Sequence, residues 1–257
     1  MTEHPRLPAT ALLDLPLPDD DTEESITGAD WHQDAIELAH IPLKGYADER
    51  AAAGLPPWYV SSQVTVLIEI PGRVWAPKPD LFVVPGAPAH GRTSYDTRTE
   101  GPVPPFILEV ASGSTWHSDV GLDKRNNKLA WYGIVGVREY LVFDPTRSYL
   151  RAPMRGWRAT PTGWQPWPPG RRSDGTEVWT SEVLGLGVYA EGPRVIFEHP
   201  QRGPLPLDPE ARREIARLNL ELGGHAGQLA ELNSQLAEER RRREELEAEL
   251  RRLRGDA

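Results

Sequence analysis

Cysteine is absent from this chain of 257 residues, which excludes disulfides and thiolate metal sites. No apolar run approaches the roughly 20 residues that a membrane-spanning helix needs. Residues 1–18 contain no basic stretch followed by an apolar core, so we expect no secretory signal. Together these absences favour a cytoplasmic protein without a membrane anchor.

Two common catalytic sequence motifs are also absent from the chain. The chain has neither a GxxxxGK[ST] phosphate-binding loop nor a Gly-x-Ser-x-Gly turn, so the sequence supports neither an NTPase nor a serine hydrolase. The net charge of −9 gives no overall basic surface of the kind typical of DNA-binding proteins. Either basic groups cluster locally or nucleic acid is not the partner.

Lysine is rare, with four lysines against 25 arginines. Two of the four, Lys124 and Lys128, lie four residues apart in a segment predicted to be helical, so they would share one helix face. Tyr132 continues that face. Arginine cannot replace lysine where a compact ammonium group is required, so both lysines are candidate site residues.

Composition divides the chain into three parts. Residues 1–28, rich in Pro, Asp and Thr, predict a disordered acidic arm. Residues 29–200 have the patterning of a folded domain. In residues 208–254, leucines such as Leu232 and Leu236 follow a heptad, which predicts a C-terminal coiled-coil helix. Self-association as a homo-oligomer is the expected role of this helix, and packing back on the folded domain is the alternative.

Within the folded domain the patterns predict both helices and strands. A helix is expected from Asp30, with a break near Pro42 and a second helical piece over 47–53. The other expected elements are strands over 62–70, 80–84, 106–111 and 138–143, a helix over 118–134, and extra β-hairpins within 147–200.

Two of these strands each carry one carboxylate in an apolar run. Asp80 begins Asp-Leu-Phe-Val-Val, and Glu109 lies within Phe-Ile-Leu-Glu-Val-Ala. A lone ionised carboxylate is costly to bury, so two on neighbouring strands suggest a shared divalent cation. Asp80, Glu109 and the backbone carbonyl of Val110 would provide the oxygen ligands that Mg²⁺ or Mn²⁺ takes. The alternative is that one or both acids pair with arginine and only stabilise the sheet.

Other polar residues carry weaker signals. His32, on the first predicted helix, has a structural role as its default interpretation, because a lone histidine is more often structural than a ligand. Ser112, Ser114 and Thr115 follow the Glu109 strand and could contact phosphate or cap the next helix, of which capping is favoured.

The order of several segments resembles one family. These segments are residues 30–32, 79–84, 108–115, 119–121, Lys128 with Tyr132, and 136–145. Together they are similar to the Uma-two family of restriction-endonuclease-like proteins, within the PD-(D/E)XK nuclease superfamily. The resemblance covers about residues 30–200.

The resemblance implies an α/β fold with a mixed central sheet flanked by helices, and it makes Asp80 and Glu109 metal ligands. The superfamily's lysine two residues after the glutamate is Ala111 here. In the family a lysine on the following helix is thought to replace it. Alignment backwards from Tyr132 gives Lys128, whereas alignment forwards from Asp119 gives a position nearer Lys124, so we prefer Lys128 and keep Lys124 open.

The sequence thus favours a Mg²⁺- or Mn²⁺-dependent endonuclease that hydrolyses phosphodiester bonds in DNA, with Asp80, Glu109 and Lys128 or Lys124 as its catalytic residues. The main alternative is a catalytically inactive nuclease fold that serves as a coiled-coil interaction module, which the net charge and the missing strand lysine favour. A nuclease acting on RNA or on branched or single-stranded DNA is a third option.

Overall fold

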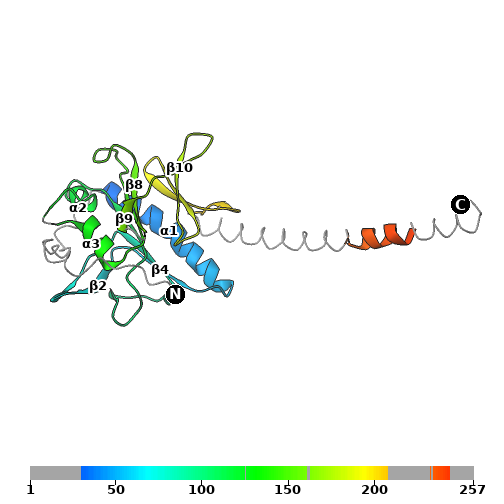
Figure 1. The fold of residues 1–257 in the computed structure, drawn as a ribbon, viewed down its shortest axis with the longest axis horizontal. Coiled ribbons are helices and arrows are strands. Elements are labelled where there is room, and N and C mark those ends of the chain that lie inside the picture. Colours follow the sequence, from blue (N-terminus) through cyan, green and yellow to red (C-terminus); the bar gives the residue numbers. More distant parts are fainter. Residues whose placement is uncertain (1–29, 125, 161–162, 208–231, 233, 244–257) are drawn as a thin grey trace, which may run out of the picture. The chain divides into compact units, whose positions relative to one another are not determined.

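A computed structural model describes residues 30–124, 126–160, 163–207, 232 and 234–243 (Figure 1). The chain divides into two compact units, Met1–Leu207 and Asp208–Ala257. The predicted arm over residues 1–28 lies outside the described residues. Most of the predicted coiled coil over 208–254 does too. Its described part, residues 234–243, is helical, and the side chains of Leu232 and Leu236 are 58% and 49% exposed.

The first helix, α1 (Asp30–Ala52), is continuous, so the predicted break at Pro42 is wrong. A proline inside a helix costs about 3 kcal/mol because its ring displaces a backbone hydrogen bond. Packing on both sides of Pro42 opposes that cost. Ala39 and Leu43 are fully buried, and Tyr46 is nearly so. None of the helices in the described part of the chain is long and apolar enough to cross a bilayer.

A six-stranded mixed sheet forms the centre of the first unit, with the strand order β1-β4-β6-β7-β8-β9. Its strands are β1 (Trp58–Ser61), β4 (Leu81–Pro85), β6 (Phe106–Val110), β7 (Glu139–Phe143), β8 (Met154–Thr160) and β9 (Gly163–Pro166). β6 and β7 are parallel, and every other neighbouring pair is antiparallel. The mixed sheet that the family resemblance implied is therefore confirmed.

The two faces of this sheet bury two separate hydrophobic cores. Leu108 and Val110 of β6 pack with α1, whereas Ile107 faces the opposite core together with residues of α3 (Lys128–Val135). This alternation follows from the two-residue period of a β-strand. α1 and α3 accordingly flank the sheet on opposite faces (Figure 1). Glu109 shares the parity of Ile107 and is 2% exposed.

Two smaller sheets complete the unit. One has the order β3-β2-β5, with β2 (Thr65–Ile70), β3 (Arg73–Trp75) and β5 (Ser94–Asp96). The other joins β10 (Gly170–Arg171), β11 (Glu177–Thr180), β12 (Gly187–Glu191), β13 (Arg194–His199) and β14 (Gly203–Pro204) in sequence order. The extra hairpins that the sequence predicted after residue 147 are present as β8–β9 and β12–β13.

The single helix predicted over 118–134 is wrong. A short helix, α2 (Trp116–Asp119), is followed by described residues that are not helical, and α3 begins only at Lys128. Gly121 has a φ of 76°, which ends helical geometry there. Asn127 starts the next helix by accepting a hydrogen bond from the backbone N–H of Ala130 at 2.9 Å. Lys124 is therefore not on the helix that carries Lys128.

A buried carboxylate fixes the turn after β7. The side chain of Asp144 accepts the backbone N–H groups of Tyr149 and Leu150 at 2.7 and 2.8 Å, and both the N–H and the hydroxyl of Thr146. Burial raises the pKa of Asp144, but these hydrogen bonds outweigh it and hold the pKa below its usual value.

The substitution Asp144→Asn is expected to lower the free energy of unfolding by about 2 kcal/mol at pH 7. The new amide N–H₂ group would face backbone N–H groups that now donate hydrogen bonds to a carboxylate oxygen of Asp144. A depressed pKa stabilises the fold above the unfolded-state value near pH 4, and that stability is lost as pH falls through the folded-state pKa. The difference between parent and variant in urea unfolding should therefore shrink below about pH 4. A difference that is constant with pH would contradict this account.

Candidate active site

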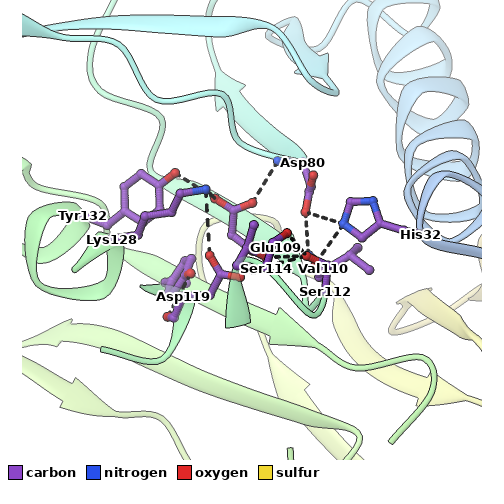
Figure 2. A network of polar contacts seen from close by, with 11 residues as sticks. His32, Asp80, Glu109, Val110, Ser112, Ser114, Asp119, Lys128 and Tyr132 are labelled. Carbon is purple, nitrogen blue, oxygen red and sulfur yellow. Dashed lines mark hydrogen bonds and ion pairs between the residues drawn. The ribbon is translucent and has the colours of Figure 1, made fainter. Parts of the chain in front are cut away.

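The two strand carboxylates meet where β4 begins and β6 ends. Because β4 and β6 are antiparallel with Leu81 opposite Leu108, Asp80 comes next to Glu109. The backbone N–H of Asp80 donates to Glu109 Oε2 at 3.1 Å, and the backbone N–H of Val110 donates to Asp80 Oδ2 at 2.8 Å. Each acid is thus held by the other's strand, and the predicted neighbourhood of Asp80, Glu109 and Val110 is present (Figure 2).

His32 reaches this junction from the N-terminal turn of α1. Its Nε2 lies 3.0 Å from the carbonyl oxygen of Val110 and 3.5 Å from Asp80 Oδ2. Burial lowers the pKa of His32, but the hydrogen bond and the charge of Asp80 outweigh it, so the pKa is raised from its ordinary value. The sequence favoured a structural role for His32 and did not predict that its ring contacts two candidate metal-ligand atoms, the Val110 carbonyl oxygen and Asp80 Oδ2.

Glu109 turns toward α3. The hydroxyl of Tyr132 donates to Glu109 Oε1 at 2.8 Å, and Lys128 Nζ lies 3.8 Å from the same oxygen. Lys128 Nζ also lies 3.9 Å from Oδ1 of Asp119, a carboxylate at the end of α2 that is 1% exposed. One buried ammonium group thus lies between two buried acids, which keeps their charges compensated.

The two candidate lysines occupy different environments. The side chain of Lys128 is 7% exposed and stands in the first turn of α3, facing Glu109. Lys124 is exposed and lies outside both neighbouring helices. Of the two lysines, it is Lys128 that contacts the acidic residues of this junction, Glu109 and Asp119. Sequence spacing could not show which lysine belongs to the site, because the prediction placed Lys124 and Lys128 on one continuous helix.

The loop of residues 112–115, which follows β6 and carries three hydroxyl side chains, does not cap α2 through a side chain as the sequence predicted. Thr115 is the N-cap residue, but its side chain makes no capping hydrogen bond. Instead, the Ser112 hydroxyl lies 3.1 Å from that of Ser114 and 3.0 Å from that of Thr115, and Ser112 Oγ accepts the backbone N–H of Thr115 at 3.3 Å. The loop is therefore organised by its own hydroxyl groups, close beside Asp80 and Glu109 (Figure 2).

The oxygen atoms at this junction are of the type that binds divalent cations. Asp80, Glu109 and the Val110 carbonyl offer oxygen ligands, the type that Mg²⁺ and Mn²⁺ prefer. In the described part of the chain, no group of three or more His, Asp or Glu side chains is placed to hold a metal ion by those side chains alone. A cation here would accordingly need the main-chain carbonyl and water as further ligands, as Mg²⁺ sites commonly do.

Comparison with known protein families gives a match over most of the chain. The family model Uma2, described as "Putative restriction endonuclease", matches residues 2–182, more than half of the chain. The match includes every residue of the junction just described. A comparison with curated proteins finds no match.

Proposed function

Because the chain belongs to the Uma2 family of restriction-endonuclease-like proteins, we propose that it is a Mg²⁺- or Mn²⁺-dependent endonuclease that hydrolyses phosphodiester bonds in DNA. The observation that carries the proposal is the reciprocal bonding of Asp80 and Glu109 across two strands, with Lys128 beside Glu109. Two acids at adjoining strand ends could hold a metal ion that offsets phosphate charge and activates water, and the buried Lys128 adds a positive charge beside one of them.

Asp80, Glu109 and the Val110 carbonyl would hold the cation, which when bound would offset phosphate charge and lower the pKa of water. The backbone N–H of Val110 orients the Asp80 carboxylate, and the Tyr132 hydroxyl orients Glu109. Hydrogen bonds of this kind leave fewer carboxylate rotamers open and so pre-organise the ligands.

Lys128 is proposed to stabilise the negative charge that develops on the phosphate, or to orient the attacking water. Its side chain is buried between Glu109 and Asp119, with Nζ 3.8 and 3.9 Å from one oxygen of each. A positive charge in a water-poor site is worth far more than one in bulk water. Ala111 occupies the position two residues after Glu109, so the charge would come from α3 instead of β6.

The experiment that tests the proposal is a plasmid-nicking assay with the purified chain in Mg²⁺, in Mn²⁺ and in excess chelator, beside Asp80→Ala purified identically. Metal-dependent nicking by the parent alone supports the proposal. Nicking that is equal in chelator, or equal in the variant, contradicts it. RNA and single-stranded DNA offered in the same buffers would define the substrate class.

The net charge of −9 favours a second candidate, a catalytically inactive nuclease fold that binds a partner through the predicted coiled coil over 208–254. A metal ion bound to the folded state raises the melting temperature by mass action. No nicking of any substrate, together with an unchanged melting temperature in millimolar Mg²⁺ and Mn²⁺, would support this candidate over the first.

The two lysines provide a matched pair of variants. Lys128→Ala is expected to slow nicking by roughly 100- to 1,000-fold, the usual effect of removing one electrostatic stabiliser of a transition state. Lys124→Ala should leave the rate within about twofold, since Lys124 is exposed and lies outside α3. Single-turnover rates measure both. Equal losses in the two variants would show that charge near the site matters but that burial beside Glu109 does not.

A further inference from the structure

The segment that joins β7 to β8 carries three arginines and one acid. Arg147, Arg151 and Arg155 are exposed, whereas Asp144 is fully buried and accepts hydrogen bonds within its own turn. Residues 144–155, here called the basic connection, therefore present a positively charged surface on a chain whose net charge is −9. This surface is a local cluster of basic groups, one of the two alternatives that the net charge left open.

The arginines of the basic connection differ from many others in the domain because they lack an acidic partner. Arginines elsewhere pair with carboxylates, and examples are Arg92, Arg158 and Arg172. Within the described part of the chain, no carboxylate forms an ion pair with an arginine of the basic connection. Arg155 lies over the ring of Trp157, 5.1 Å from its centroid, which leaves the guanidinium donors open to an outside acceptor.

The register of the central sheet places the basic connection beside the proposed active site. Phe143, the last residue of β7, pairs with Val110, so the connection begins at the edge of the sheet where β6 ends. Glu109 pairs with Val142, and Val142 pairs in turn with Arg155. Paired residues point to the same face and strands lie about 4.8 Å apart, so the backbone of Arg155 stands roughly 10 Å from that of Glu109.

The basic connection also contacts the loop of residues 112–115 and the start of α2. Tyr149 stacks on Trp116 with 6.2 Å between the ring centroids and 28° between the ring planes. A Cβ added at Gly113 would lie 3.4 Å from the Tyr149 hydroxyl oxygen, so the backbone of the loop passes close to this tyrosine. Because the same loop lies beside Glu109 (Figure 2), a continuous packed surface leads from the arginines to the carboxylates.

The backbone at Arg147 gives an independent indication. Its φ is 56°, in the left-handed region that is unfavourable for a residue with a Cβ and that glycine adopts freely. Strained residues of this kind gather at functional sites. An exposed arginine at a position suited to glycine therefore points to a use for its charge.

We propose that Arg147, Arg151 and Arg155 bind the phosphate backbone of the DNA and hold it beside the carboxylates of the active site. The inference rests on the proposed endonuclease function and adds the surface that binds the substrate. A guanidinium group donates two hydrogen bonds at once to a phosphate, and each neutralised phosphate releases counterions. Contacts of this kind position the duplex without reading its sequence.

Arg138 provides a matched control. It lies just before β7, at the opposite end of that strand from the basic connection, and it is exposed. No carboxylate in the described part of the chain forms an ion pair with it. Arg138→Gln therefore removes the same charge from the same sheet, at the edge away from Glu109. An effect of net charge alone would be equal in Arg138→Gln and in Arg147→Gln.

The test is fluorescence anisotropy of a short labelled DNA duplex titrated with the full chain, in excess chelator and at several salt concentrations. The triple variant Arg147→Gln, Arg151→Gln, Arg155→Gln is expected to raise Kd at least about 100-fold at about 0.1 M salt. The slope of log affinity against log salt should become shallower by about 2 to 3, because each phosphate contact contributes about 0.9. Arg138→Gln should change Kd by less than about twofold.

Two further variants separate DNA contact from an effect on folding. The double variant Arg147→Gln, Arg151→Gln leaves the packing of Arg155 on Trp157 intact, and it replaces the triple variant if melting curves show that the triple variant does not fold. Arg147→Gly should melt at or above the temperature of the parent, since glycine tolerates the positive φ. Its Kd should nevertheless rise several-fold, which a purely structural role for Arg147 does not predict.

Equal weakening by Arg138→Gln and Arg147→Gln, unchanged binding by the triple variant, or no binding of DNA by the parent would each overturn the inference. Plasmid nicking by the triple variant with an unchanged KM would also overturn it but leave the endonuclease proposal standing. Binding that the triple variant loses, in a parent that nicks no plasmid with either metal, would support this surface and overturn the endonuclease proposal.

Discussion

Plasmid nicking by Asp80→Ala is expected to fall by about 10⁴-fold or more relative to the parent chain. The substitution removes a carboxylate proposed to hold the cation, and with it both the charge compensation and the activation of water, each worth several kcal/mol. It also removes the acceptor for the backbone N–H of Val110, which bonds to Asp80 Oδ2 at 2.8 Å.

That second loss calls for a matched variant. An N–H left without its acceptor at a part-buried site costs about 1–3 kcal/mol of stability, so inactivity of Asp80→Ala alone could reflect local unfolding. Asp80→Asn keeps an oxygen that can accept the Val110 N–H and removes only the charge. We expect Asp80→Asn to melt near the parent and to be equally inactive. Parental nicking by a folded Asp80→Asn would refute the role of this carboxylate.

Glu139→Ala is expected to lower the free energy of unfolding by about 3–5 kcal/mol, the cost of breaking a buried ion pair. Glu139 begins β7 and is 1% exposed. Its Oε1 accepts Arg158 at 3.0 Å and the backbone N–H of Glu182 at 2.8 Å, and its Oε2 accepts the hydroxyl of Ser181. One carboxylate therefore ties the central sheet to the turn that precedes β12.

Glu182 supplies the control for this prediction, since its carboxylate contacts the same guanidinium of Arg158 at 3.0 Å but is 67% exposed. Exposed ion pairs contribute about 0–1 kcal/mol, so Glu182→Ala should change stability little. Urea unfolding at pH 7 compares the two variants. Similar losses from both would mean that Arg158 pairing, and not the burial of Glu139, accounts for the stability.

The strands around the site could be predicted from sequence because their signal is local. The apolar runs after Asp80 and around Glu109 predicted both elements to within a residue, and the carboxylate in each run suggested that the two strands are neighbours. The helix after Glu109 could not be predicted as well. Its apolar spacing continues across Gly121, but the left-handed backbone at that glycine ends α2, and the new helix start at Asn127 leaves Lys124 outside the helix that carries Lys128.

The contact of His32 with Asp80 depends on information that no local pattern holds. Helical spacing placed His32 on α1, but which strand ends it meets is set by how the whole helix docks on the sheet. The persistence of α1 through Pro42 has the same origin, since burial of Leu43 and Tyr46 overrides a strong local preference. The signal that could have drawn attention to His32 is its place at a helix start, ahead of two strands that each carry an acid at one end.

The docking of α1 has a consequence for the order of synthesis. α1 packs against β1 and also against β13, near the far end of the domain. A ribosome delivers α1 first and β13 last, so an emerging chain holds Asp80 and Glu109 before the surface that seats α1 is whole. The contacts of His32 with Asp80 and Val110 can therefore settle only after nearly the whole domain has left the ribosome.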